Sequence, residues 1–171
     1  MKLPFLEPEN DIYYNLGVLL LLIKILCKTT RGTLKLNNSR LQTYLFLVNN
    51  PVKLNDFLNL LGKKNAVLSD FDYYSVKSIS PNIEPLFDRD GLKYLVSVLV
   101  SKSYIDLEYK KGNGFFYTLT EVGNDQVSLL SSEKFSEIEL LCNRLKSTLS
   151  ISDSEINKTL NIIIKRDSYN A

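Results

Sequence analysis

The stretch YIDLEYKKGNGFFYTLT, residues 104–120, decides the fold. Apolar and charged residues alternate from 105 to 110, and apolar residues alternate again at 115, 117 and 119, after a Gly-Asn-Gly turn at 112–114. Period-two alternation is typical of strands, and a short glycine-rich turn between two such runs favours an antiparallel connection. The stretch therefore predicts a two-stranded hairpin with a flexible tip.

Helical apolar spacing precedes and follows this hairpin. It predicts helices over 11–27 (capped by Asn10), 41–48 and 53–61, the last one ending at Gly62, and a fourth from Asp88 to the hairpin. Thr120 is expected to cap the next helix, Phe135–Leu149 form another, and a capping box at 152–155 starts the last one. Residues 63–86 are equally compatible with a strand and with a long loop.

This order of elements is typical of winged-helix domains, in which the hairpin is the wing beside a helix bundle. We expect an α+β, mainly helical fold: a winged-helix-like bundle with one antiparallel β-hairpin and C-terminal helices. The winged-helix-like domain is predicted over residues 1–131 and a C-terminal helical extension over 132–171.

The residue types available argue against catalysis. The chain has no histidine, so the commonest general base and metal ligand is absent, and no glycine-rich phosphate-binding loop precedes a helix. Asp88 and Asp90 stand at a helix start, where capping is a commoner role than binding a cation. We therefore expect no enzymatic activity, no cofactor and no metal.

The cysteines, the apolar runs and the N-terminal residues indicate the cellular location. Cys27 and Cys142 lie in apolar stretches and are expected to be core residues in a reducing compartment. No apolar run reaches 18 residues, and acidic residues stand where a signal peptide has its apolar segment. The prediction is a cytoplasmic protein that does not span a membrane.

Positive charge is concentrated early in the chain, since residues 12–55 hold six Lys or Arg and no Asp or Glu. The helix before the hairpin, DRDGLKYLVSVLVSK at 88–102, offers few donors for base edges, so sequence-specific groove reading is not expected. The candidates for sequence-independent contact with nucleic acid are Lys28, Arg31, Lys35, Arg40, Lys110 and Lys111. A basic surface that is only solvated remains the alternative.

A partner interface is predicted from excess apolar surface. The first helix is apolar around nearly its whole circumference, and the C-terminal helices add two further apolar stripes. The residues expected to meet a partner are Tyr13, Leu20, Ile156, Leu160 and Ile163.

Three stretches carry a family resemblance: LQTYLFLVNNP at 41–51, DGLKYLVSVLVSKSYIDLEY at 90–109 and FFYTLTEVGNDQV at 115–127. Together they resemble the middle components of bacterial ABC-three-component antiviral defence systems, the group that includes the small subunit of Lamassu-type systems. The resemblance implies a non-catalytic adaptor that bridges an SMC-like or RecN-like coiled-coil ATPase to an effector such as a nuclease and contacts DNA. A winged-helix transcription regulator, dimerising through helices at 135–149 and 154–166, stays open as the alternative.

Overall fold

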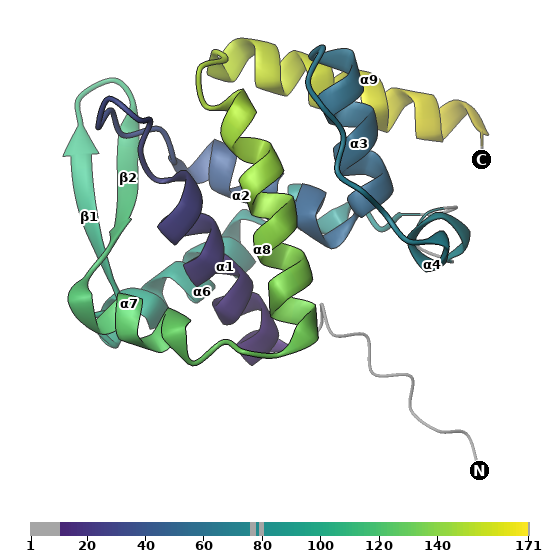
Figure 1. The fold of residues 1–171 in the computed structure, drawn as a ribbon. Coiled ribbons are helices and arrows are strands. Elements are labelled where there is room, and N and C mark those ends of the chain that lie inside the picture. The colour runs from purple at the N-terminus through teal and green to yellow at the C-terminus, as the bar shows by residue number, and fades with distance from the viewer. Residues whose placement is uncertain (1–10, 76–77, 79–80, 171) are drawn as a thin grey trace.

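A computed structural model of the chain describes residues 11–75, 78 and 81–170 (Figure 1). Its elements are α1 (Ile12–Leu26), α2 (Asn38–Asn49), α3 (Pro51–Leu60), α4 (Asp70–Tyr74), η2 (Glu84–Leu86), α6 (Arg89–Ser101), β1 (Ile105–Lys110), β2 (Gly114–Leu119), α7 (Glu121–Ser128), α8 (Glu133–Leu145), η3 (Lys146–Thr148) and α9 (Asp153–Asn170). The predicted fold class is confirmed: the chain is mainly helical, winged-helix-like, with one antiparallel hairpin and C-terminal helices. Among the described residues, no helix has the length and apolar character needed to cross a bilayer.

Helix ends lie where side chains satisfy free backbone groups. The Asp11 carboxylate accepts from the Tyr13 amide at 2.7 Å and caps α1, whereas the predicted cap Asn10 lies outside the described residues. Asp88 Oδ1 accepts from the Gly91 amide at 2.8 Å, which confirms its capping role at α6. Thr120 caps α7 in the same way, at 3.0 Å from the Gly123 amide.

The predicted hairpin is present, and in its register Ile105 pairs with Leu119 and Tyr109 with Phe115. Its turn depends on glycine, because Gly112 and Gly114 have φ of 85° and 80°. The segment before α2 joins the hairpin: Asn37 forms a β-bridge with Phe116, and the Tyr117 amide donates to the Leu36 carbonyl at 3.3 Å. This bridge fixes the wing to the start of α2.

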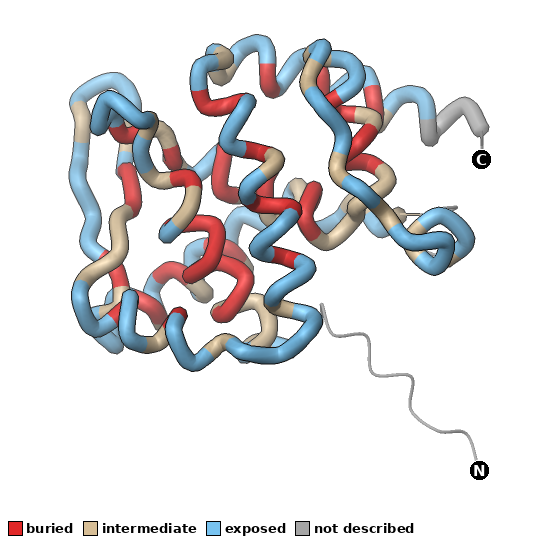
Figure 2. The backbone as a smooth tube through the Cα atoms, viewed as in Figure 1, coloured by how far each residue is buried: buried red, intermediate tan, exposed pale blue. Residues whose placement is uncertain are grey.

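Helix α1 lies at the centre of the molecule, and every residue from Gly17 to Ile23 is buried (Figure 2). It contacts α2, α6, β2, α7 and α8. Gly17 permits a close approach of α8, since a Cβ atom there would lie 2.7 Å from the Phe135 ring. The expectation that apolar α1 surface remains for a partner is therefore wrong for its central turns, because the chain's own elements cover them.

The C-terminal helices complete this core rather than extend from it. Helix α8 packs along α1, and α9 packs against α2 and α3. Their buried residues belong to the same apolar cluster as those of α1, and they are Ile138, Leu141, Cys142, Leu145, Leu149, Ile156, Leu160 and Ile163. The apolar stripes proposed for dimerisation are thus used within the chain.

The segment left open by the sequence contains the short helices α4 and η2, and its described residues include no strand. It is tied to the bundle by polar contacts. The side chain of Asn55 exchanges two hydrogen bonds with the backbone of Ala66, at 2.8 and 3.0 Å, and Gln42 Nε2 donates to the Pro85 carbonyl at 3.0 Å.

Candidate interaction surfaces

Five of the six predicted nucleic-acid residues lie outside the core. Lys28, Arg31 and Lys111 are exposed, and Lys35 and Lys110 are half-buried. A β-bridge between Lys28 and Leu34 closes a tight turn in which Gly32 has a φ of 80°. In Figure 1 this turn and the hairpin tip both lie at the upper end of the molecule, and we call these five residues the basic end.

The hairpin tip combines lysines with aromatic rings. Lys110 Nζ lies 3.5 Å from Glu108 Oε1 and 5.4 Å from the centroid of the Phe116 ring, so part of its charge is already engaged. Tyr109 and Phe115 face each other across the strands with ring centroids 5.3 Å apart, and both remain exposed. The tip therefore offers Lys111 and two rings to a ligand.

Arg40 was expected to contact nucleic acid, and this is wrong because its side chain is only 2% exposed. Its Nε atom lies 2.5 Å from Asp153 Oδ1 at the start of α9, and its two terminal nitrogens donate to the Ile151 carbonyl and, at 3.3 Å, to the Tyr44 hydroxyl. A buried guanidinium needs such acceptors. Arg40 therefore fastens α2 to the α8–α9 connection.

Further polar contacts complete this buried network. Asn37 Nδ2 donates to Asp153 Oδ2 at 2.7 Å, and the hydroxyls of Tyr44 and Thr148 lie 2.8 Å apart. Desolvation by burial raises the pKa of Tyr44, and the nearby Arg40 charge opposes this only in part. Tyr44 thus acts as a neutral hydrogen-bonding group at neutral pH.

The predicted partner residues divide into two groups. Leu20, Ile156, Leu160 and Ile163 are buried in the chain's own core, so they form no part of the surface. Tyr13, at the first turn of α1, is 79% exposed and remains a candidate. A charged residue at Ile163 would disturb folding and would not report on a partner.

A set of exposed apolar side chains that the sequence analysis did not single out lies in the segment between α3 and α6. Its side chains are Val67, Phe71, Tyr73, Tyr74 and Phe87, and all five are at least half exposed. We call this set the α4 surface. The only sequence signal was the density of aromatic residues in a stretch without helical periodicity.

Helix α6 occupies the position that reads DNA in winged-helix regulators. It buries Leu92, Val96 and Leu99, and Tyr94 and Val100 are among its exposed side chains. Lys93 lies 3.7 Å from Asp90 on the same helix. Arg89 is also exposed at its first turn, so α6 presents two cations, one of them paired.

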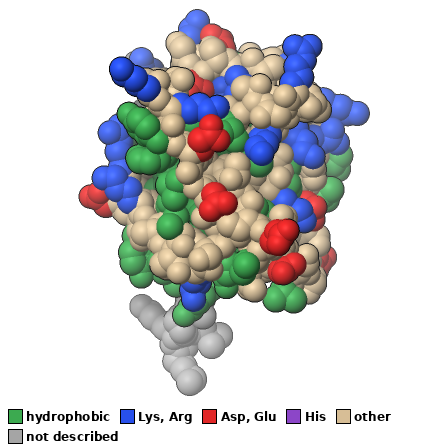
Figure 3. Space-filling view, turned by 90° about the vertical axis from the view of Figure 1, so that its left-hand side faces the viewer, with side chains coloured by type: hydrophobic (Ala, Val, Ile, Leu, Met, Phe, Trp, Pro, Cys, Tyr) green, Lys and Arg blue, Asp and Glu red, His purple; other side chains and the backbone are tan. Residues whose placement is uncertain are grey.

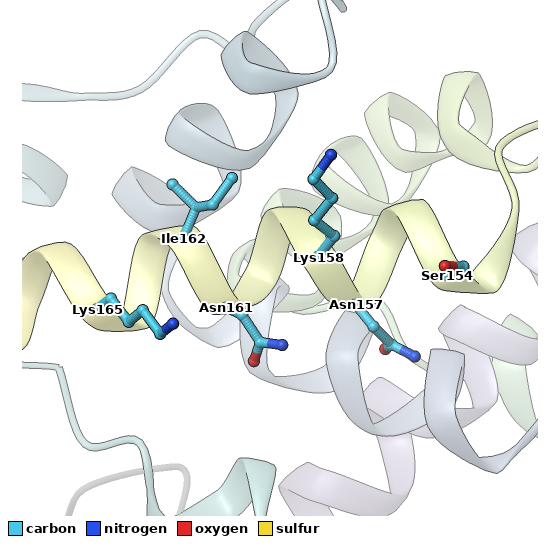
Figure 4. A pocket seen from close by; sticks show the side chains of 6 residues that line it. All are labelled: Ser154, Asn157, Lys158, Asn161, Ile162 and Lys165. Atoms are coloured by element: carbon cyan, nitrogen blue, oxygen red, sulfur yellow. The ribbon is translucent and has the colours of Figure 1, made fainter.

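A polar surface lies along α9, and the sequence analysis did not single it out either. Ser154, Asn157, Lys158, Asn161, Ile162 and Lys165 line a shallow open groove of about 480 Å³ (Figure 4). Every lining residue belongs to the same helix, so the groove is a surface feature and encloses no ligand-sized cavity.

Charge is unevenly distributed over the molecule. Figure 3 looks onto the hairpin side, where most Lys and Arg side chains lie in the upper half and most Asp and Glu side chains in the middle and lower parts. No group of three or more metal-ligating side chains occurs among the residues that the structure describes. Burial raises the pKa of the Cys27 and Cys142 thiols, which keeps both protonated and poorly nucleophilic.

Comparison with known proteins adds one match. Residues 26–158 match the family described as ABC-three component (ABC-3C) system Middle Component 4. No curated protein and no solved structure matches the chain. The matched region runs from the end of α1 through the wing to the first turns of α9, so it includes the basic end, the α4 surface and the Arg40 network.

Proposed function

The chain belongs to the Middle Component 4 family of ABC-three component systems, and on that premise we propose that it is a non-catalytic cytoplasmic adaptor that bridges an SMC-like ATPase to an effector subunit and contacts DNA without reading its sequence. A middle component works together with other subunits, so the adaptor needs a surface for at least one of them.

The α4 surface is the observation that carries the proposal. It exposes five large apolar side chains within residues 67–87, outside the core of the bundle. Exposed apolar side chains at this density, four of them aromatic, are typical of protein–protein interfaces, in which aromatic residues are enriched. We assign it to the large ATPase subunit, and Tyr13 is the candidate contact on α1.

The basic end supports the DNA contact. Lys28, Arg31 and Lys111 are exposed, and lysines and arginines that neutralise phosphates give sequence-independent, salt-sensitive binding. Helix α6 contributes little to base reading, because Tyr94 and Val100 lie on its exposed face. This combination favours an adaptor over an operator-specific regulator.

Co-purification tests the partner surface. The tagged chain is co-expressed with the other subunits of its system, as the wild type and as the double variant F71D/Y74D. Removing two aromatic anchors and introducing two charges at an interface costs at least about 4 kcal/mol, so the ATPase is expected to be lost from the pull-down. Circular dichroism of each variant confirms that it is folded.

The control places a single aspartate on an exposed apolar residue elsewhere. Leu129, at the end of α7, is as exposed as the α4 residues, and L129D is expected to retain the ATPase at the wild-type level. Retention of the ATPase by folded F71D/Y74D, or absence of any ATPase with the wild-type chain, contradicts the proposal.

A further inference from the structure

We infer that the outward face of α9 continues the DNA contact, so that the phosphate backbone of a duplex lies along this helix as well as on the basic end. This inference rests on the DNA contact proposed above and adds a second region to the DNA-binding surface. The residues concerned are Ser154, Asn157, Lys158, Asn161 and Lys165, which we call the α9 stripe.

The stripe follows from helical spacing. Its members recur three or four residues apart, so they lie on one side of α9, opposite the buried Ile156, Leu160 and Ile163. Figure 4 shows their side chains along the same length of helix. All five are Ser, Asn or Lys, the residue types that donate hydrogen bonds to phosphate oxygens.

Negative charge near the stripe is engaged or lies to one side. Asp153 accepts hydrogen bonds from Arg40 and Asn37. Glu155 lies about 100° around the helix from Ser154, outside the stripe, on the same side of α9 as Arg166 about three turns further along. Among the described residues neither Lys158 nor Lys165 forms a salt bridge, so both charges are available to a ligand.

Contacts connect the stripe to the wing. Ser39 donates to Asn157 Oδ1 at 3.4 Å, which leaves the amide NH₂ of Asn157 as a donor. The Tyr117 hydroxyl donates to the neighbouring Asn38 side chain. The exposed first turn of α2 therefore lies between β2 and the start of α9, and one polar surface runs from the wing to the stripe. Both ends of that surface lie in the upper part of the molecule (Figure 1).

Size and composition favour a duplex over an acidic protein. From Ser154 to Lys165 the stripe is about 16 Å long at 1.5 Å per residue, which matches about five base pairs at 3.4 Å. Ile162, at the groove edge and 37% exposed, is the one large apolar side chain among the groove residues. A protein interface of this length would need an apolar centre, whereas a phosphate backbone needs donors and positive charge.

The test measures binding of the full-length chain to a fluorescent 30-base-pair duplex of arbitrary sequence at several salt concentrations. K158A/K165A removes both stripe charges. Loss of two phosphate contacts should weaken binding at least about tenfold at 0.1 M salt and lower the slope of log K against log[salt] by about 1.8. R31A/K111A tests the basic end in the same way.

The control is K93A/K134A, which removes two exposed lysines from α6 and α8 and gives the same net charge. Its affinity should stay within about twofold of the wild type, because only long-range attraction changes. Circular dichroism verifies that each variant is folded. An excess of polyglutamate serves as an acidic polypeptide competitor.

Each outcome decides between the two proposals. Weakening by both R31A/K111A and K158A/K165A, beyond the control, supports both. Weakening by R31A/K111A alone overturns the role of α9 and leaves the proposed DNA contact intact. Wild-type binding in both variants overturns both. If polyglutamate displaces the duplex at equal charge concentration, the α9 stripe is a site for acidic protein, and the assignment to DNA is wrong.

Discussion

Asp153→Ala provides a direct test of the buried network. Arg40 is almost fully buried, so removing Asp153 leaves its guanidinium with two neutral acceptors, the Ile151 carbonyl and the Tyr44 hydroxyl. Breaking a buried ion pair on one side costs about 3–5 kcal/mol. The Asp153 side chain is 47% exposed, which places the expected loss near the lower limit, about 3 kcal/mol.

Urea denaturation followed by circular dichroism measures this loss, and the thermal midpoint should fall by about 6–12 °C for a chain of this length. Glu137→Ala is the matched control, since it removes one carboxylate from an exposed pair with Lys134 at 3.3 Å and should cost less than about 0.5 kcal/mol. Asp153→Ala with a stability within 0.5 kcal/mol of the control would refute the reasoning. An unchanged m-value is required for the comparison.

Three other expectations concern packing, pH and catalysis. Gly123→Ala places a Cβ atom 2.0 Å from the Tyr104 carbonyl oxygen and should cost more than about 2 kcal/mol, whereas Gly112→Ala, strained only by its positive φ, should cost about 1 kcal/mol. The urea midpoints of the two variants compare them, and equal values contradict the close contact. Burial raises the folded-state pKa of Tyr44, Tyr117 and Cys142, so the unfolded chain loses protons first. The stability that these three neutral groups contribute should be fully present below about pH 8.5 and should decline as pH rises through 9–11. A constant urea midpoint between pH 8 and 10.5 would exclude this. The purified chain alone should hydrolyse no ATP and cut no DNA, and turnover abolished by a point substitution would disprove it.

The hairpin could be predicted because all of its determinants are local. Alternation at 105–110 and glycines at 112 and 114 specify the strands and the turn within seventeen residues. The helix ends at Asp88 and Thr120 are local in the same sense, since each cap bonds an amide three residues later. These features therefore agree with the structure.

The burial of Arg40 could not be predicted in the same way, because its ionic partner Asp153 is 113 residues away. One signal was present: Arg40, Tyr44 and Leu47 follow helical spacing, which places the arginine on the buried stripe of α2. The positive charge of the segment 12–55 instead favoured a surface position for Arg40.

The interface residues were misplaced for a related reason. Apolar residues around the whole circumference of α1 indicate that Leu20 is buried. They do not indicate whether the same chain or a partner buries it. The α9 stripe follows from residue spacing, but Ile156, Leu160 and Ile163 mark only the buried face of that helix. The α4 surface lacks any period, and the density of aromatic residues in its sequence does not show which of them are exposed.

The enclosed position of α1 determines how the ends of the molecule can move. The wing, α2 and α8 all pack on this helix, and α9 packs on α2. Sliding the wing relative to α9 would open α1 to water, at about 1.5–3 kcal/mol for each leucine that becomes exposed. A hinge between them is therefore costly. A load applied at the wing is therefore transmitted through α1 and α2 to α9 with little change in the shape of the bundle.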